Sequence, residues 1–94
     1  MGLFVKKNSR TQYYVIQKLD KHGNTSFLQE KSVIPTRMTW GSDFAAERYM
    51  DMFRAKSVFK RVKATEKGNE LIRLMLFDWK ENKYTNAVEH NNNK

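Results

Sequence analysis

The sequence has no cysteine, only one proline and only four glycines, and each scarcity excludes a class of site. Without cysteine there is no disulfide framework, no thiolate metal site and no cysteine nucleophile, which is typical of proteins from a reducing compartment. The few glycines are scattered, so the chain has no glycine-rich phosphate loop. It also lacks the Gly-x-Ser-x-Gly nucleophile elbow of many hydrolases.

Long hydrophobic runs are missing as well. No apolar stretch approaches the roughly 20 residues that a membrane-spanning helix needs. The first residues, Met-Gly-Leu-Phe-Val-Lys-Lys, are too briefly apolar for a secretory signal. Lys6 stands where an N-myristoylation motif carries serine or threonine. We therefore expect a cytoplasmic protein without membrane contacts.

Histidine is scarce, and neither of the two histidines has a catalytic setting. His22 lies in a predicted turn and His90 near the end of the chain, and no acidic residue stands at a spacing that would pair it with either one. We interpret both as solvated side chains. Together with the missing nucleophile motifs, this predicts a protein that is not an enzyme and that has no catalytic residues and no cofactor.

One acidic pattern has a spacing that could hold a metal ion. Asp43, Glu47 and Asp51 recur every four residues and would share one face of a helix. Such a face could bind a hard cation. Arg48 and Arg54 interleave with the acids, however, and we favour a salt-bridged solvent face and no metal site.

The residues that are present predict one folded domain. Hydrophobic residues make up 39% and aromatic residues 13% of the chain, too many for a disordered protein. We predict a single α+β domain over residues 1–85. Residues 86–94 are polar and have little to bury, so we predict a mobile tail there.

The clearest helical pattern covers Thr39–Lys56. Ser42 or Asp43 can cap its start, because their side-chain oxygens can accept from free backbone amides. Apolar residues recur at helical spacing, and the expected core-facing stripe is Ala46, Tyr49, Met50 and Phe53, flanked by Ala45 and Met52. Residues 41–56 hold three basic and three acidic residues. Because a DNA-reading helix usually carries more positive charge, we interpret this helix as a structural brace.

Alternating patterns before and after this helix predict strands. The segments are Leu3–Lys7, Thr11–Leu19, Asn24–Glu30 and Ser57–Lys63. Asp20–Gly23 matches a type I turn, which would join the second and third of them into a hairpin.

Two further segments leave alternatives open. Ser32–Ile34 precedes Pro35 and fits either an edge strand or an extended connection. Leu71–Lys80 fits a strand or a helix capped by Asn69, and we favour the strand because a turn at residues 65–69 links it tightly to the segment before it. The resulting fold class is α+β, an antiparallel sheet of about five strands with one amphipathic helix across one face, in the order β-β-β-α-β-β.

The net charge of +8 points to anionic partners. Four cations without an intervening acid follow the predicted helix: Lys56, Lys60, Arg61 and Lys63. On a strand, Phe59 would share a face with Arg61 and Lys63, as in sheet platforms that stack bases and bind phosphates of single-stranded nucleic acid. The basic residues Lys6, Lys7 and Arg10 could extend this patch. The enlarged patch could bind RNA, DNA or an acidic protein surface. The alternative, a solvated strand face, fits slightly better because the aromatic motif of RNA-recognition sheets is absent.

Large aromatic residues are more numerous than a core of this size needs: Trp40, Phe44, Phe77, Trp79 and Tyr84. Phe44 falls on the polar side of the predicted helix and should be exposed. Exposed aromatics near arginine are enriched in protein interfaces. We therefore take Phe44, Phe77 and Trp79 as protein-interface candidates and expect Trp40 to pack on the first turn of the helix.

The layout resembles a group of small bacteriophage-encoded accessory proteins of unknown or anti-defence role. The resemblance rests on a hairpin, an extended segment, Thr39–Trp40, Asp43, Ala45–Ala46, an amphipathic helix and a final hairpin, and covers roughly residues 11–65. It implies a non-enzymatic protein of phage or mobile-element type that acts in the host cytoplasm. There it would bind and modulate or inhibit a host protein or nucleoprotein, such as a CRISPR or restriction complex. Inhibitors that mimic DNA are acidic, whereas this chain is basic.

These observations lead to a main hypothesis and two alternatives. The main hypothesis is an anti-CRISPR-like binding protein that occupies a host protein or nucleoprotein. The first alternative is direct nucleic-acid binding through the basic and aromatic face of a sheet. The second is a small virion or assembly component.

Overall fold

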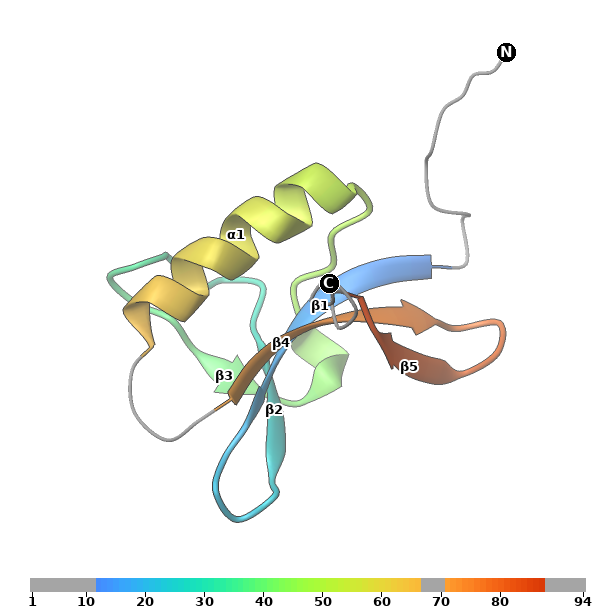
Figure 1. The fold of residues 1–94 in the computed structure, drawn as a ribbon, viewed down its shortest axis with the longest axis horizontal. Helices are drawn as coiled ribbons and strands as arrows, with labels where there is room; N and C mark the ends of the chain where they lie inside the picture. The colour runs from blue at the N-terminus through green and yellow to red at the C-terminus, as the bar shows by residue number, and fades with distance from the viewer. Residues whose placement is uncertain (1–11, 67–70, 88–94) are drawn as a thin grey trace, which may run out of the picture.

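The computed structural model describes residues 12–66 and 71–87. Its elements are β1 (Gln12–Leu19), β2 (Thr25–Leu28), β3 (Trp40–Gly41), the 3-10 helix η1 (Asp43–Ala45), α1 (Met52–Thr65), β4 (Leu71–Asp78) and β5 (Lys83–Asn86). The strands form one antiparallel sheet in the order β3-β2-β1-β4-β5, and α1 lies over one of its faces (Figure 1). The predicted α+β fold with a five-stranded sheet and one helix is confirmed, although several elements lie elsewhere in the sequence.

The centre of the sheet is the pair β1–β4. The two strands are in register over their whole length, from Gln12 opposite Asp78 to Leu19 opposite Leu71. Of the segment Leu71–Lys80, Leu71–Asp78 is therefore a strand, as favoured, and the alternative helix is wrong. Both faces of the strand are buried in its middle, because Leu74 faces α1 and Met75 belongs to a second cluster on the other face.

The β1–β2 hairpin turns where the sequence predicts. The Asp20 carboxylate accepts hydrogen bonds from the backbone amides of His22 and Asn24, at 2.8 and 2.9 Å. Gly23 has a φ of +87°, a conformation that side-chain-bearing residues rarely adopt. These two residues fix the turn, and the predicted strands on either side of it are confirmed as β1 and β2.

The predicted helix over Thr39–Lys56 is wrong. Most of that range forms β3, η1 and an extended segment, and α1 begins only at Met52. Its N-cap is Asp51, whose carboxylate accepts from the amide of Phe53 at 3.1 Å. The predicted cap, Ser42, precedes only the three residues of η1 and makes no side-chain cap hydrogen bond.

Backbone hydrogen bonds to the sheet explain the late start of the helix. The extended segment Ala46–Tyr49 lies between β1 and β2 where these strands diverge, with Tyr49 bridging Tyr14 and Ala46 bridging Gln29. The amide of Tyr49 donates to the carbonyl of Tyr14 at 2.9 Å, and the amide of Glu47 donates to the carbonyl of Leu28 at 2.9 Å. Tertiary pairing thus replaces the local helix that the residue spacing favours.

The strand predicted at Ser57–Lys63 is also wrong, because these residues form the middle of α1. The β-branched residues Val58 and Val62 favour a strand locally, but helix propensity is a weak preference that packing overrides. Met52, Ala55, Phe59 and Val62 stand at helical spacing, and all four contribute to the cluster under the helix. Burial of this stripe on the sheet selects the helix.

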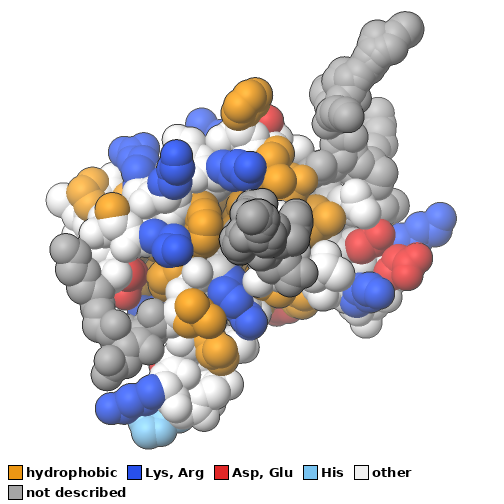
Figure 2. All heavy atoms as spheres, viewed as in Figure 1, with side chains coloured by type: hydrophobic (Ala, Val, Ile, Leu, Met, Phe, Trp, Pro, Cys, Tyr) orange, Lys and Arg blue, Asp and Glu red, His pale blue; other side chains and the backbone are white. Residues whose placement is uncertain are grey.

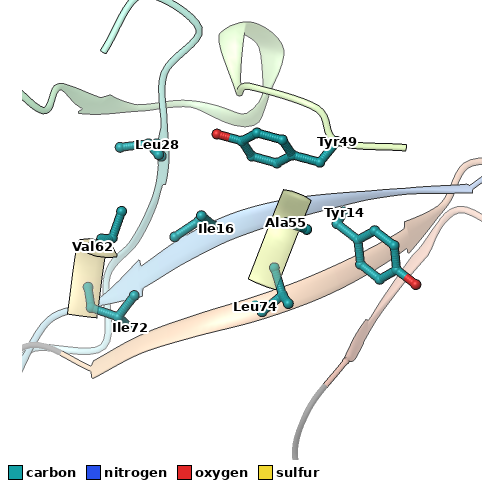
Figure 3. Close-up of a cluster of buried hydrophobic side chains, with 8 residues drawn as sticks. All are labelled: Tyr14, Ile16, Leu28, Tyr49, Ala55, Val62, Ile72 and Leu74. Atoms are coloured by element: carbon teal, nitrogen blue, oxygen red, sulfur yellow. The ribbon is translucent and has the colours of Figure 1, made fainter. Parts of the chain in front are cut away.

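The main core lies between α1 and the sheet. Figure 3 shows Ala55 and Val62 of α1 on either side of Ile16 of β1, with Ile72 and Leu74 of β4 below them. The cluster also contains Tyr14, Leu28 and Tyr49. The expected core stripe is corrected at Met50 and Phe53, which are 51% and 83% exposed.

A second, smaller cluster lies on the opposite face of the sheet. Val15, Phe27, Ala46 and Met75 are its buried members. Gln17, a buried polar side chain on the same face, accepts hydrogen bonds from the guanidinium of Arg73 on β4. Among the described residues, no α-helix contributes to this second cluster.

The remaining predictions concern connections and ends. Val33 and Arg37 form an isolated bridge around a turn that contains a cis Ile34–Pro35 bond, so Ser32–Ile34 is not an edge strand of the sheet. Asn86, assigned above to the tail, ends β5, and the amide of Ala87 donates to the carbonyl of Leu74 at 2.9 Å. The strand predicted at Leu3–Lys7 and the rest of the tail lie outside the described residues.

Candidate functional site

The outer face of α1 concentrates positive charge. The helix buries Ala55 and Val62 against the sheet, which turns its opposite side outward. Within Met52–Thr65 the basic residues are Arg54, Lys56, Lys60, Arg61 and Lys63, and there is no acidic residue. The equal number of acidic and basic residues expected for the helix was counted over residues 41–56 and is corrected. Helix α1, at Met52–Thr65, carries five cations.

Three lysines form one side of this face, here called the lysine flank: Lys56, Lys60 and Lys63. Their spacing of four and three residues places them on one side of the helix. Phe59 lies at the base of the flank, half-buried, with the Nζ of Lys63 5.4 Å from the centroid of its ring. Figure 2 shows lysine and arginine side chains gathered over α1.

An exposed aromatic ring adjoins the lysine flank. The Phe53 side chain is 83% exposed, although phenylalanine usually lies in a core. An open groove of about 500 Å³ runs beside it, lined by Phe53, Lys56, Ser57, Phe59 and Lys60. The groove therefore combines apolar rings with ammonium groups, the two kinds of group that a nucleotide chain contacts.

The two arginines form the other side of the helix, here called the arginine flank. Arg54 and Arg61 stand seven residues apart, so they lie on one side, and both line a pocket between α1 and residues 28–34 and 47–49. The prediction that Arg61 shares a face with Phe59 and Lys63 is wrong, because it assumed a strand with a repeat of two residues. On the helix Arg61 points away from Lys63.

The structure thus unites four of the eight residues of the predicted basic site, on a helix instead of a sheet. Lys56, Phe59, Lys60 and Lys63 come together, whereas Lys6, Lys7 and Arg10 lie outside the described residues. The sequence reasoning missed Phe53 and Arg54. Asp51 as a capping residue, followed by a run without acids up to Thr65, was the signal that would have included them.

The aromatic interface candidates have different surroundings. Phe44 of η1 is 86% exposed and Trp79, after β4, is 58% exposed. Phe77 is half-buried, with its ring centroid 5.3 Å from that of Tyr13 and 4.6 Å from that of Tyr84. Exposure therefore supports Phe44 and Trp79 as contact residues more than Phe77.

Trp40 does not pack on the first turn of the helix as expected. It lies in β3, with the Nζ of Lys18 4.5 Å from its ring centroid. The same Nζ lies 3.6 Å from a carboxylate oxygen of Glu66, just past the C-terminal end of α1. Trp40 is thus placed near the last turn, because the helix begins later than the sequence suggested.

The three acidic residues considered as metal ligands do not lie on one helix. Asp43 lies in η1 and Asp51 caps α1, so Asp43, Glu47 and Asp51 do not share a helical face. Among residues 12–66 and 71–87, no group of three histidine, aspartate or glutamate side chains is arranged to hold a metal ion.

Comparisons with protein-family models, curated protein sequences and solved structures found no match to this chain. In the described parts of the chain, no helix combines the length and the apolar character needed to cross a membrane.

Proposed function

We propose that this protein binds single-stranded nucleic acid along the outer face of α1. The observation that carries the proposal is Phe53, an exposed ring beside the lysine flank on a helix that has no acidic residue. Aromatic rings stack on unpaired bases, and ammonium groups neutralise phosphates, so this combination suits a strand whose bases are free.

The geometry favours a single strand over a duplex. The bases of a duplex are stacked inside it, whereas the groove beside Phe53 and Phe59 offers apolar surface to an unstacked base. From Lys56 to Lys63 the helix rises by about 10 Å, so the three ammonium groups can contact successive phosphates of one strand. The contact surface is a helix, which corrects the sheet face expected from the sequence.

The test is fluorescence anisotropy with labelled dT12, rU12 and a DNA duplex. The titrations begin at about 50 mM salt, because phosphate contacts are stronger at low salt, and are repeated at higher salt concentrations. We expect dT12 or rU12 to bind more tightly than the duplex. Changing Lys56, Lys60 and Lys63 together to glutamine should weaken binding more than tenfold. It should also reduce the slope of log K against log salt by about 2, since each single-strand contact contributes about 0.7.

A matched control removes equal charge elsewhere. The control changes Lys21, Lys80 and Lys83 to glutamine, and these residues are exposed in hairpins away from α1. It should bind with nearly the wild-type slope. Phe53→Ala should lose roughly 1–3 kcal/mol of affinity for the single strand, whereas Phe53→Tyr keeps a stacking ring and should retain it.

Two outcomes would contradict the proposal. One is a lack of binding to every probe at low salt, and the other is equal weakening by the control. Vesicles with anionic lipid form a further arm, because basic faces with exposed aromatics also bind membranes. Binding to vesicles but not to oligonucleotides would mean that the ligand of this face is a lipid surface and not nucleic acid.

A second candidate function is binding to a host protein or nucleoprotein, with Phe44 and Trp79 as anchors. Its support is the 86% exposure of Phe44, since exposed aromatic residues are typical interface anchors. A pull-down from nuclease-treated bacterial lysate tests it. The hypothesis expects a stoichiometric partner that Phe44→Ala loses and the triple lysine variant keeps. The phage or mobile-element origin and anti-defence role stay predictions.

A further inference from the structure

A pocket of about 280 Å³ opens on the arginine flank of α1, separate from the groove on the lysine flank. Leu28, Ile34 and Val58 contribute apolar side chains to its wall, and Tyr49 contributes an aromatic ring with a hydroxyl. Pockets for drug-sized ligands are usually about 300–1,000 Å³, so this volume suits one small ring system. The exposed surface of the pocket is nevertheless mainly polar, so hydrogen bonds must recognise most of a ligand there.

The charged lining of this pocket comprises two carboxylates, Glu30 and Glu47, and two guanidinium groups, Arg54 and Arg61. No ion pair joins these four groups within the described part of the chain. They are therefore available to a ligand, and the pocket presents both acceptors and donors.

Two further polar side chains of the pocket, Gln29 and Ser32, are already engaged in hydrogen bonds. The Nε2 of Gln29 donates to the carbonyls of Phe27 and Ser42, at 2.8 and 3.0 Å. The Oγ of Ser32 accepts from the amide of Thr39 at 2.8 Å. The charged groups that can recognise a ligand are therefore the two carboxylates and the two arginines, beside the hydroxyl of Tyr49.

The carboxylates influence each other. Burial first, and then the charge of Glu30, raise the pKa of Glu47, while Arg54 opposes this shift. The two acids are therefore close enough for their repulsion to be felt. A ligand that brings N–H donors between them would relieve this repulsion, because a carboxylate accepts strongly from such donors.

We propose that this pocket binds a guanine base of the bound strand, with Glu30 and Glu47 accepting from the base and Arg54 and Arg61 donating to it. Guanine has two adjacent donors, N1–H and the N2 amino group, which one carboxylate can accept together. Its O6 and N7 are acceptors that a guanidinium contacts in pairs.

The other bases match these groups less well. Adenine and cytosine place an acceptor nitrogen beside their amino group, so one carboxylate oxygen would meet a lone pair. Uracil and thymine have one imide donor between two carbonyls, which repel a carboxylate on both sides. A site selects its ligand partly by such mismatches. The pocket therefore distinguishes guanine from the other bases.

The position of the pocket fits a strand that follows α1. Its two arginines belong to the same helix as the lysine flank, and a helix with its side chains is about 10–12 Å wide. One nucleotide that crosses the helix can therefore reach the pocket while its neighbours contact the lysines. This inference rests on the proposed function and adds a base preference to it.

The experiment compares dT12 with three probes that carry one central G, A or C, by anisotropy at about 50 mM salt. We expect the G probe to bind at least about fivefold more tightly than the other three. Glu47→Gln should remove this preference, so that the G probe binds no more tightly than dT12 does to the same variant. Glu81→Gln, the same charge change on an exposed turn residue, should keep the preference.

The outcomes separate this inference from the proposed function. Equal affinity for all four probes overturns the guanine pocket and leaves strand binding intact. If no oligonucleotide binds, the proposed function fails, and NMR titration with guanosine or adenosine monophosphate still tests the pocket. Amide shifts at Glu30 and Glu47 with the guanine nucleotide alone support it, and equal or absent shifts overturn it.

Discussion

The hydroxyl of Tyr84 in β5 donates a hydrogen bond to the carboxylate of Asp43 in η1, with 3.3 Å between Oη and Oδ2. The contact joins two segments that lie 41 residues apart in the sequence. Burial, followed by the charge of Asp43, raises the pKa of Tyr84 above its ordinary value. Phe44 follows Asp43, so this contact helps to fix the part of the chain that exposes the Phe44 ring.

Tyr84→Phe should lower the free energy of unfolding by about 0.5–1 kcal/mol, measured by urea denaturation. The substitution removes one hydrogen bond and keeps the ring that contacts Phe27 and Phe77. A double-mutant cycle with Asp43→Ala checks the pairing. Purely additive effects of the two substitutions would show that the hydrogen bond contributes nothing.

Asp51→Ala should destabilise the protein by about 1 kcal/mol, because it leaves the amide of Phe53 without its capping carboxylate. Asp51→Ser can restore the cap and should recover most of the loss. Urea unfolding and the far-ultraviolet circular dichroism of both variants test this. If Asp51 lay inside a longer helix, as the sequence suggested, alanine would instead be stabilising.

Phe53→Ala should change the free energy of unfolding by no more than about 0.5 kcal/mol, because the ring is 83% exposed. Leu74→Ala, at a fully buried site under α1, should cost about 2–5 kcal/mol. Chemical denaturation of the two variants compares them directly. A large loss in the free energy of unfolding for Phe53→Ala would mean that Phe53 belongs to the core, as the residue spacing suggests.

The protein should lose stability as the pH rises from about 10 to about 12. Burial, and then the charge of Glu47, raise the pKa of Tyr49 to about 12 from an ordinary value of 10.0. The unfolded chain therefore releases this proton first, and the free energy of unfolding falls over that range while it is unaffected below pH 10. The raised pKa of Tyr84 acts in the same direction.

Urea unfolding at pH 9 and pH 11 measures this loss. Tyr49→Phe should show a smaller difference between the two pH values, because the ring stays and the titrating hydroxyl is gone. An equal difference in wild type and variant would mean that Tyr49 titrates normally in the folded state.

The strands could be predicted because their patterns are local. Alternation over residues 12–19 and 71–78, with the Asp20–Gly23 turn, is visible in the sequence and gives β1, β4 and the first hairpin. The helix could not be placed in the same way. Ala46 and Tyr49 have helical spacing, but their backbones pair with Gln29 and Tyr14, which are distant in sequence.

The misplaced start of the helix also limits how much of the candidate site the sequence predicts. The cations from Lys56 to Lys63 were recognised from the absence of acidic neighbours, which depends on the sequence alone. Phe53 was assigned to the core because the predicted helix began too early, and Arg54 was set aside with it. The pocket beside Arg54 and Arg61 depends on segments that only folding brings together, and no local pattern indicates it.

The register of β1 against β4 also bears on how quickly the chain folds. Residues 20–70 separate the two central strands and contain β2, β3, η1 and α1. β1 and β4 can pair only when this long segment brings its two ends together. Closing so long a loop costs conformational entropy before any contact repays it. Chains rich in such distant pairings fold in milliseconds to seconds. Helix α1 cannot speed up this step by forming early, because it packs on β1 and β4, which pair only after closure.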